Sequence, residues 1–279
     1  MLSVVATPIG NLRDITLRAL DALAAADVIA CEDTRRTRAL LTAHSLRAPE
    51  VVACDERREL ALAPRRVARA LAGEQVVLVS DAGLPAVADP GRELIRCAIE
   101  AGCPLTVLPG ASSIETALVA SGLAAEGYCF CGWPPRRAGE RRSFLAAALA
   151  RELPQVLLES PRRLVATLAE LAELAADREI AVARELTKLH EEVVRGTASA
   201  VSAAGVREQG ELCIVVAGAT PVHGEIPSPA ARRVLELLIG HGVGVRESAD
   251  AVAQLSGETR RELYAAASSL RQASQTARP

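Results

Sequence analysis

The chain has 279 residues, of which 50% are hydrophobic, 24% are charged and 2% are aromatic, and its formal net charge is −2. This composition is typical of a globular protein and excludes an intrinsically disordered chain. The near-neutral charge excludes a simple polybasic binder of nucleic acid or membranes, although it leaves room for a local basic patch.

Residues 1–120 predict a first α/β domain. Short apolar runs predict strands at 4–7, 28–31, 51–54, 76–80 and 105–108. Amphipathic segments lie between these runs and predict helices. Strands that alternate with helices in this way form a mainly parallel, five-stranded sheet with helices on both faces.

Several helix starts can be predicted within this half. Asp14 and Thr16 are candidate N-caps of the first helix, whose apolar face carries Leu17, Leu20 and Leu23. Further along the chain, Asp89 precedes a proline and a glycine and is a candidate cap. The segment 112–115, Ser-Ser-Ile-Glu, resembles a capping box.

Residues 121–219 predict a second α/β domain. Strand-like runs occur at 128–131, 155–159, 179–183, 192–195 and 212–217, with helical segments near 143–152, 161–176 and 197–204. The short connection at 184–192 allows an antiparallel pair, so we expect a mixed sheet. The Pro- and Gly-rich segment 218–229 is typical of a linker. Helical patterns at 230–239, 246–255 and 259–271 predict a small helical appendage, residues 230–279.

The seven cysteines show no spacing typical of a zinc site, so no metal site is predicted. Cys31, Cys54 and Cys213 lie in or beside apolar strand-like runs and are expected to be buried thiols, as in a reducing compartment. The sequence contains no apolar run of 18 residues, and Met1 leads almost directly into the first strand. We therefore expect a cytoplasmic protein without a membrane span or signal peptide.

Loops at the carboxyl ends of the first five strands are the places to look for a ligand site. These loops carry glycines, hydroxyls and carboxylates, and they span 7–11, 31–36, 54–57, 80–85 and 108–113. Each loop taken singly is better explained by turn or helix-cap chemistry, but five such loops at one sheet edge favour a binding site. The chain has no G-x-G-x-x-G after a strand, no phosphate loop and no G-x-S-x-G elbow, which argues against hydride transfer, a kinase or a serine hydrolase.

The loop sequences resemble a known family. Residues 6–16, ATPIGNLRDIT, and 31–35, CEDTR, are similar to those of bacterial 16S ribosomal RNA cytidine 2′-O-ribose methyltransferases. That family belongs to the tetrapyrrole methylase superfamily, also called class III methyltransferases. Matching motifs follow in order at 80–85, 88–91, 109–113, 159–163, 183–188 and 210–212, and the helical tail is also similar. The chain departs from the family pattern at Leu84, where Thr is usual, and at 54–59, which lacks the usual His and Asn.

The resemblance implies two α/β domains with S-adenosylmethionine in the cleft between them, and a homodimer. It also implies that the substrate is the small ribosomal subunit and the target a cytidine in the decoding region of 16S ribosomal RNA. Cofactor contacts, several of them through the backbone, would fall on Pro8, Ile9, Asp81, Leu84, Ser112, Ser113, Leu158, Leu186 and Glu211. The loop glycines Gly83 and Gly110 join this set, because glycine lets a ligand approach the backbone.

Methyl transfer to a ribose hydroxyl benefits from a base, because the hydroxyl must lose its proton. Candidate catalytic residues are Lys188, Glu185, Glu32 and Asp33. Lys188 is the single lysine of the chain, and three interpretations stay open. A lowered pKa beside Arg184 would make Lys188 a base, a protonated Lys188 would hold an RNA phosphate, or Arg184 and Glu185 form a structural ion pair.

Two arginine clusters are candidate RNA-binding residues, because guanidinium groups suit phosphate contacts. They comprise Arg35 and Arg36, and Arg136, Arg137, Arg141 and Arg142. Solvated surface arginines explain either cluster equally well. Trp133 is the one candidate for base stacking, so recognition of a shaped RNA site is favoured over stacking on a single strand. A tetrapyrrole C-methyltransferase and a non-catalytic ribosome-assembly factor are the alternative functions.

Overall fold

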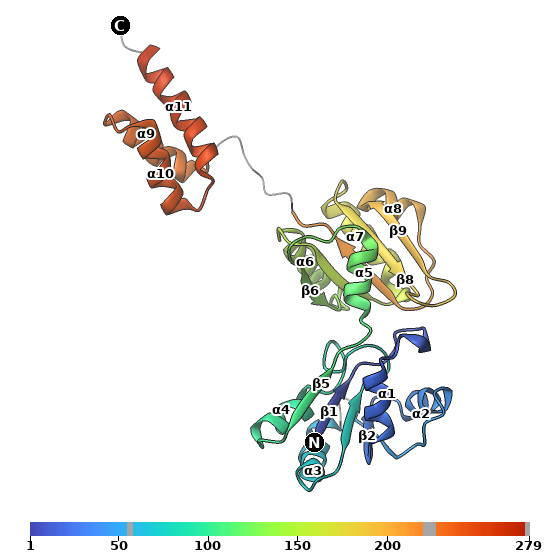
Figure 1. Ribbon diagram of the computed structural model, residues 1–279. Coiled ribbons are helices and arrows are strands. Elements are labelled where there is room, and N and C mark those ends of the chain that lie inside the picture. The colour runs from blue at the N-terminus through green and yellow to red at the C-terminus, as the bar shows by residue number, and fades with distance from the viewer. Residues whose placement is uncertain (55–57, 220–226, 277–279) are drawn as a thin grey trace. The chain divides into compact units, whose positions relative to one another are not determined.

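The computed structural model describes residues 1–54, 58–219 and 227–276, with side chains described as far as residue 272. Residues 55–57, which form most of one predicted ligand loop, lie outside the described residues. The chain divides into two compact units, Met1–Gly218 and Ala219–Pro279 (Figure 1).

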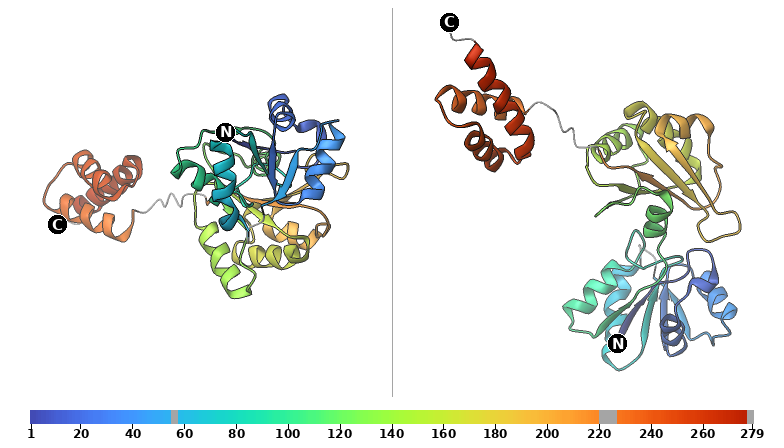
Figure 2. Two further views of the ribbon diagram at one scale, coloured as in Figure 1. Left: turned by 90° about the horizontal axis from the view of Figure 1, so that it is seen from below. Right: turned by 45° about the horizontal axis from the view of Figure 1, so that its top comes forward.

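The first half of the larger unit contains a parallel sheet of five strands in the order β3-β2-β4-β1-β5, as predicted (Figures 1 and 2). The three inner strands read VIAC, VVLV and LSVV and are buried on both faces, which is typical of a parallel sheet between two helix layers. The strands are β1 (Leu2–Val5), β2 (Val28–Cys31), β3 (Glu50–Ala53), β4 (Val76–Val79) and β5 (Leu105–Leu108).

Helices cover both faces of this sheet. One core contains Leu23 and Leu41 from α1 (Leu17–Ala24) and α2 (Thr34–Ala43). The other contains Val67 and Leu94 from α3 (Glu59–Leu71) and α4 (Arg92–Glu100). The 3₁₀ helix η1 (Leu12–Asp14) precedes α1.

The helix starts confirm one predicted cap and correct another. The Thr16 hydroxyl accepts a hydrogen bond of 3.1 Å from the N–H of Ala19, as expected of an N-cap. Asp89 does not cap α4, because Gly91 with φ 129° occupies the N-cap position. The buried carboxylate of Glu59 accepts the Leu94 N–H at 2.9 Å instead, so the cap comes from the neighbouring helix α3.

The second half contains a mixed sheet of five strands in the order β6-β7-β10-β8-β9. The pair β6–β7 is parallel and the other three pairs are antiparallel, including the predicted hairpin β8–β9. The strands are β6 (Cys129–Gly132), β7 (Gln155–Glu159), β8 (Glu179–Arg184), β9 (Glu192–Thr197) and β10 (Leu212–Val216).

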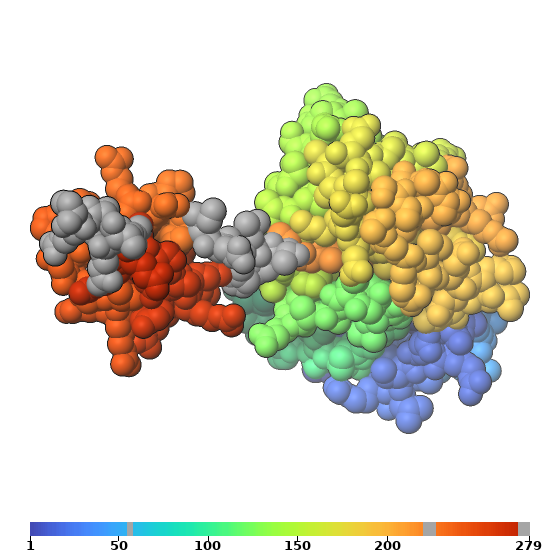
Figure 3. All heavy atoms as spheres, turned by 90° about the horizontal axis from the view of Figure 1, so that it is seen from above, coloured from blue at the N-terminus to red at the C-terminus, as the bar shows by residue number. Residues whose placement is uncertain are grey.

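Helix α5 (Ser113–Ser121) leaves the first sheet and packs on the second. Its Ile114 and Leu118 share a core with Val156 and Val215 of the mixed sheet, and Ile9 from the loop after β1 joins that core. Figure 3 shows the green segment with α5 between the blue first half and the yellow second half. The opposite face of the mixed sheet is covered by α6 (Ala138–Leu149), α7 (Pro161–Leu174) and α8 (Ala198–Ala204).

The smaller unit is a three-helix cluster around Leu235, Val252 and Leu263. Its helices are α9 (Pro229–Gly240), α10 (Val245–Ser256) and α11 (Arg260–Thr276). Among the described residues, no helix combines the length and apolar character needed to cross a bilayer.

Candidate active site

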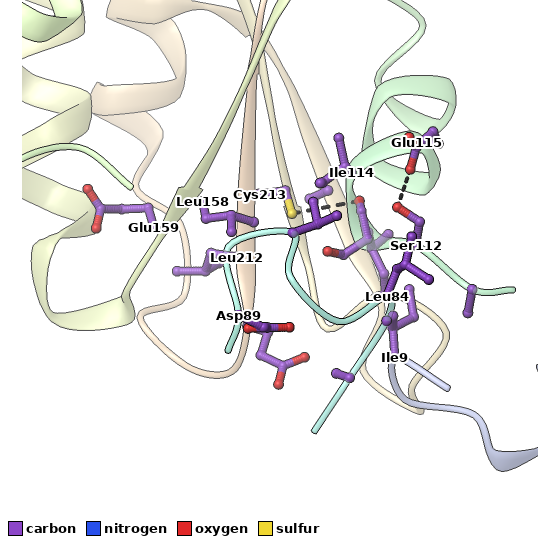
Figure 4. Close-up of a pocket in the computed structure, with 18 of the residues that line it drawn as sticks. Ile9, Leu84, Asp89, Ser112, Ile114, Glu115, Leu158, Glu159, Leu212 and Cys213 are labelled. Atoms are coloured by element: carbon purple, nitrogen blue, oxygen red, sulfur yellow. Dashed lines mark hydrogen bonds between the residues drawn. The ribbon is translucent and has the colours of Figure 1, made fainter. Parts of the chain in front are cut away.

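A cavity of about 500 Å³ lies between the two halves of the larger unit, at the carboxyl ends of the first-sheet strands. This volume falls within the usual range for small-molecule and cofactor sites, about 300–1,000 Å³. In Figure 4, Ile9, Leu84 and Ser112 face Leu158 and Cys213 across the cavity. The predicted cofactor residues in its lining are Ile9, Gly83, Leu84, Gly110, Ser112, Ser113, Leu158, Leu186 and Glu211.

Two glycines in the cavity wall, Gly83 and Gly110, let the loops after β1, β4 and β5 approach one another closely. Thr7 and Gly83 exchange two main-chain hydrogen bonds of 2.9 and 3.0 Å, which tie the loop after β1 to the loop after β4. Gly83 has φ 79°, a conformation that glycine adopts without strain. A Cβ on Gly110 would lie 2.9 Å from the Cβ of Ala6, so a side chain there would push the loop after β5 away. The wall therefore depends on both predicted glycines.

The start of α5 differs from the predicted capping box. Ser112 occupies the N-cap position, but its side chain makes no capping bond. Its hydroxyl instead donates to the Glu115 carboxylate (Figure 4). The same carboxylate also accepts a 2.5 Å hydrogen bond from the Tyr128 hydroxyl. Ser112 and Glu115 both line the cavity, so this hydrogen-bonded group forms one side of its polar lining.

Negative charge gathers at the cavity. Asp89 lines it, and burial together with the charges of Glu32, Asp81 and Glu211 raises the pKa of Asp89 to about 6. Loss of hydration and the charge of Asp81 also raise the pKa of Glu32. The cavity therefore favours a cationic ligand, because each carboxylate gains from a nearby positive charge.

Two further lining residues are not poised for chemistry. Burial raises the pKa of the Cys213 thiol to about 11, so the thiol stays protonated at neutral pH. The buried Glu159 carboxylate points away from the cavity (Figure 4). It forms an ion pair with Arg163 at 2.6 Å and accepts a hydrogen bond from the Thr167 hydroxyl at 2.6 Å. Both side chains therefore serve packing and local structure.

Comparison with known proteins identifies the family. The family profile described as Tetrapyrrole (Corrin/Porphyrin) Methylases matches residues 1–202. The chain belongs to the tetrapyrrole methylase family. Its relatives include Ribosomal RNA small subunit methyltransferase I of Mycobacterium tuberculosis, 43% identical over 93% of this chain and 91% of that protein. The protein of the same name from Neisseria meningitidis serogroup B is 39% identical over 94% of this chain and 91% of its own length.

A solved tetrapyrrole methylase shows the same fold. Uroporphyrin-III C-methyl transferase from Thermus thermophilus, complexed with S-adenyl homocysteine, superposes with a TM-score of 0.55 at 22% identity. The superposition covers 77% of this chain and 96% of that one. The predicted family and the two-sheet architecture are thereby confirmed.

The present chain has a second cavity of about 300 Å³, which adjoins the first. The two cavities share Ile9, Ala82 and Glu211 in their linings. Pro8 and Asp81, which the sequence assigned to the cofactor, line the smaller cavity rather than the larger one. All the predicted cofactor residues thus border one or both of two adjoining cavities.

Lys188 lines the smaller cavity between two carboxylates. Its Nζ lies 2.9 Å from Glu185 Oε1 and 3.3 Å from Glu211 Oε2. Burial lowers the pKa of Lys188, but the hydrogen bonds and charges of both carboxylates outweigh burial, so the pKa is raised. The interpretation that Lys188 has a lowered pKa is therefore wrong, and Arg184, the cation invoked for it, pairs with Glu192 at 3.1 Å.

Glu185 is held in the same cluster. Its Oε1 accepts the main-chain N–H of Glu211 at 3.0 Å, and the hydrogen bond from Lys188 lowers its pKa. Glu185 and Thr187 have φ of 50° and 65°, a left-handed backbone that bulky residues rarely adopt. These turns flank Leu186, which lines the larger cavity. Arg184 pairs with Glu192 and Glu185 pairs with Lys188, so these two residues do not form the ion pair with each other that was one of the open interpretations.

Asp33 has a structural role at the start of α2. Its carboxylate accepts the Arg35 N–H at 2.8 Å and pairs with the Arg35 guanidinium at 2.7 Å, which holds the pKa of Asp33 well below its usual range. The main-chain N–H of Asp33 donates to Asp81 Oδ1 at 3.0 Å. Neither Asp33 nor Glu32 lines either cavity, although both lie beside Asp81.

The predicted RNA-binding arginines fall into different environments. Arg35, Arg36, Arg136, Arg137 and Arg142 are exposed, and Arg36 lies 3.5 Å from Asp81 at the smaller cavity. Arg141 is 9% exposed in its side chain and binds both carboxylate oxygens of Glu170, at 3.0 and 2.6 Å. We remove Arg141 from the RNA surface as a correction, because its guanidinium is buried and already paired.

Sequence reasoning missed Asp89 and Glu115 as cavity residues. Asp89 stands in a motif at 88–91 that supported the resemblance, yet it was interpreted as a helix cap. Glu115 was interpreted as part of a capping box. Both interpretations considered only neighbours in the sequence, whereas the cavity brings together residues from distant loops.

Across the ranges that the structure describes, no group of three or more His, Cys, Asp or Glu side chains could hold a metal ion.

Proposed function

We propose that this protein transfers a methyl group from S-adenosylmethionine to the ribose 2′-hydroxyl of a cytidine in the decoding region of 16S ribosomal RNA. The observation that carries the proposal is the similarity to relatives named ribosomal RNA small subunit methyltransferase I over more than nine-tenths of both chains. The cavity between the halves gives the activity a place, because it is bordered by the motif loops on which the resemblance rests.

The larger cavity fits the cofactor. Ile9, Leu84, Leu158 and Leu186 offer apolar walls, and Gly83 and Gly110 let a ligand approach the backbone. The carboxylates Asp89 and Glu211 complement a sulfonium charge. When bound, the cofactor supplies an activated methyl group with a good leaving group, so the protein mainly aligns donor and acceptor. The complex of the Thermus relative with S-adenyl homocysteine supports this assignment.

The predicted catalytic residues stay proposals with different roles. Lys188 is protonated, which suits a phosphate contact rather than proton abstraction. Asp33 is committed to capping α2 and to the orientation of Asp81. Glu32 lies beside the site with a raised pKa. Glu185 accepts a hydrogen bond from Lys188 and so holds the ammonium group in position. These side chains would shape the site rather than exchange a proton with the substrate.

The small ribosomal subunit is the proposed partner, and the exposed arginines are its proposed phosphate contacts. Arg136 and Arg137 follow Trp133, which is 50% exposed and lines the larger cavity. An RNA segment bound there would lie beside the cofactor.

We also propose a homodimer in the cytoplasm. Leu17 and Leu189, exposed at 80% and 92%, are apolar side chains that a dimer interface would cover.

The alternative functions have less support. A tetrapyrrole C-methyltransferase shares the fold at only 22% identity, well below the ribosomal relatives. A non-catalytic assembly factor would not need the close glycine packing around a cavity of cofactor size.

An acceptor comparison tests the proposal. Labelled S-adenosylmethionine is incubated with the protein and three acceptors: small subunits lacking the modification, naked 16S RNA, and uroporphyrinogen III. We expect label in ribosomal RNA and none in the tetrapyrrole. Label in the tetrapyrrole alone would establish the first alternative, and cofactor binding without transfer to any acceptor would overturn the proposed activity.

A further inference from the structure

The two cavities meet at one ionisable side chain. Ile9, Ala82 and Glu211 line both spaces, and Glu211 is the one titratable residue among them. Its side chain is 57% exposed, and its Oε2 lies 3.3 Å from Lys188 Nζ. A group at this junction reaches a molecule in either cavity, which is the position that methyl transfer between two bound molecules requires.

The smaller cavity has the chemistry of a nucleotide site. Arg36 and Lys188 place two cations in its lining, and Thr37 contributes a hydroxyl that donates to the carbonyl of Asp33 at 3.2 Å. Arg36 is 62% exposed in its side chain and so is available to phosphate at the cavity mouth. A volume of about 300 Å³ lies at the lower end of the usual range for small-molecule sites and suits a nucleoside.

We propose that the smaller cavity receives the ribose of the acceptor nucleotide and that the Glu211 carboxylate accepts the proton of its 2′-hydroxyl. This inference rests on the proposed function. The ribose oxygen gains the methyl carbon, the carbon–sulfur bond of the donor breaks with its electron pair left on sulfur, and the hydroxyl proton moves to Glu211. The carboxylate then returns the proton to water through the exposed side of its side chain.

The other acidic and basic groups are less suited to this role. Glu185 lines neither cavity, and its Oε1 accepts hydrogen bonds from Lys188 and from the Glu211 N–H. Asp33 is bound to Arg35. Asp81 accepts the Asp33 N–H and faces Arg36, and it borders the smaller cavity alone. Lys188 is a positioning residue, because its ammonium group holds Glu185 and Glu211 in one cluster.

Glu211→Gln tests the proton acceptor, with Glu208→Gln as matched control. Glu208 is an exposed carboxylate on the same segment and lines neither cavity. Filter binding of small subunits should give affinities within a few-fold of wild type for both variants. Glu211→Gln should bind S-adenosylmethionine several-fold more weakly in calorimetry, because its carboxylate also lines the larger cavity, so transfer is measured with each variant saturated with cofactor. Single-turnover transfer should fall by about 100-fold or more in Glu211→Gln alone, the usual size of a general-base contribution.

Arg36→Gln tests the acceptor cavity by binding alone. Without cofactor, this variant should bind small subunits about tenfold more weakly, while its affinity for S-adenosylmethionine stays unchanged. Unchanged subunit affinity would overturn the placement of the acceptor, and wild-type transfer by Glu211→Gln would overturn its role. In both cases the proposed function stands if the wild-type protein methylates small subunits, and it fails separately if the wild-type protein does not.

Discussion

The main-chain N–H of Asn11 donates a 2.9 Å hydrogen bond to the hydroxyl of Thr187. This contact joins the loop after β1 to the β8–β9 connection, so it links the two halves that enclose the larger cavity. The neighbouring Gly10 lies so close that a Cβ there would be 2.5 Å from Lys188 Cγ and 2.9 Å from the Leu186 carbonyl oxygen. The cavity therefore depends on tight packing between segments that are distant in sequence.

Gly10→Ala should damage the site more than the fold. The added methyl group forces apart the two loops that carry Ile9 and Leu186, and overpacking of this kind costs about 1–3 kcal/mol. We expect cofactor affinity to fall by about tenfold or more in calorimetry. Gly139→Ala is the control, because a Cβ at Gly139 meets nothing within 4 Å. Normal cofactor affinity in Gly10→Ala would show that the loops are not held as described.

Cofactor affinity should rise between pH 5 and pH 7 through Asp89. The Asp89 carboxyl has a pKa of about 6, so it is neutral below this pH and attracts a sulfonium above it. Calorimetry across this range should show the increase for S-adenosylmethionine and a smaller one for S-adenosylhomocysteine, whose sulfur carries no positive charge. In Asp89→Asn the increase should shrink. An equal slope in that variant would assign the pH dependence to another group.

The same group should affect the stability of the free protein in the opposite direction. The Asp89 pKa is raised in the fold above its unfolded value of about 4, so the folded state binds more protons between these values. Its contribution to the free energy of unfolding is therefore present below pH 4 and is lost as the pH rises through about 6. Urea unfolding of wild type and Asp89→Asn should show their difference growing with pH over this interval, and a constant difference would contradict the assignment.

Arg141 and Arg142 should separate stability from RNA binding. Arg141 forms a largely buried pair with Glu170, their side chains being 9% and 16% exposed, and removal of one partner of a buried pair typically costs about 3–5 kcal/mol. Arg142 pairs with Glu173 at the surface, where an ion pair contributes about 1 kcal/mol or less. Arg141→Ala should therefore lower the unfolding free energy strongly. Arg142→Ala should leave the unfolding free energy nearly unchanged and weaken small-subunit binding. If Arg141→Ala instead weakened small-subunit binding without loss of stability, Arg141 would belong to the RNA surface.

Glu115→Ala should weaken cofactor binding without unfolding the protein. Glu115 is exposed and accepts hydrogen bonds from the hydroxyls of Ser112 and Tyr128, so its loss frees Ser112 to change rotamer. A net hydrogen-bond contribution of about 1 kcal/mol corresponds to roughly a fivefold loss of affinity. Tyr128→Phe removes one donor and keeps the Ser112 contact, so its effect should be smaller. Equal effects of the two variants would contradict this order.

Much of the fold could be predicted because its signals are local. The apolar runs at 28–31, 105–108 and 155–159 coincide with β2, β5 and β7, since turn residues bound each run. The short 184–192 connection likewise predicted the antiparallel β8–β9 pair. Parallel strands bring their following loops to one edge, which is why those loops border the cavities.

The remaining features depend on long-range contacts that spacing does not reveal. Arg141 is buried by Glu170, which lies 29 positions away, and Lys188 is held protonated partly by Glu211, 23 positions away. Asp89 was expected to cap a helix, but Glu59 from a neighbouring helix takes that role. Local sequence predicts that these residues are charged, whereas tertiary packing decides what each charge contacts.

The most direct test of the account is mass spectrometry of nucleosides from small subunits that lack the modification, after incubation with the protein and S-adenosylmethionine. The account predicts one new 2′-O-methylcytidine, located in the decoding region of 16S ribosomal RNA. It also predicts that Gly10→Ala, which displaces Ile9 in the wall of the larger cavity, yields less of this product at limiting cofactor. A methyl group on a base, or ribose methylation at a nucleotide other than cytidine, would contradict the central claim.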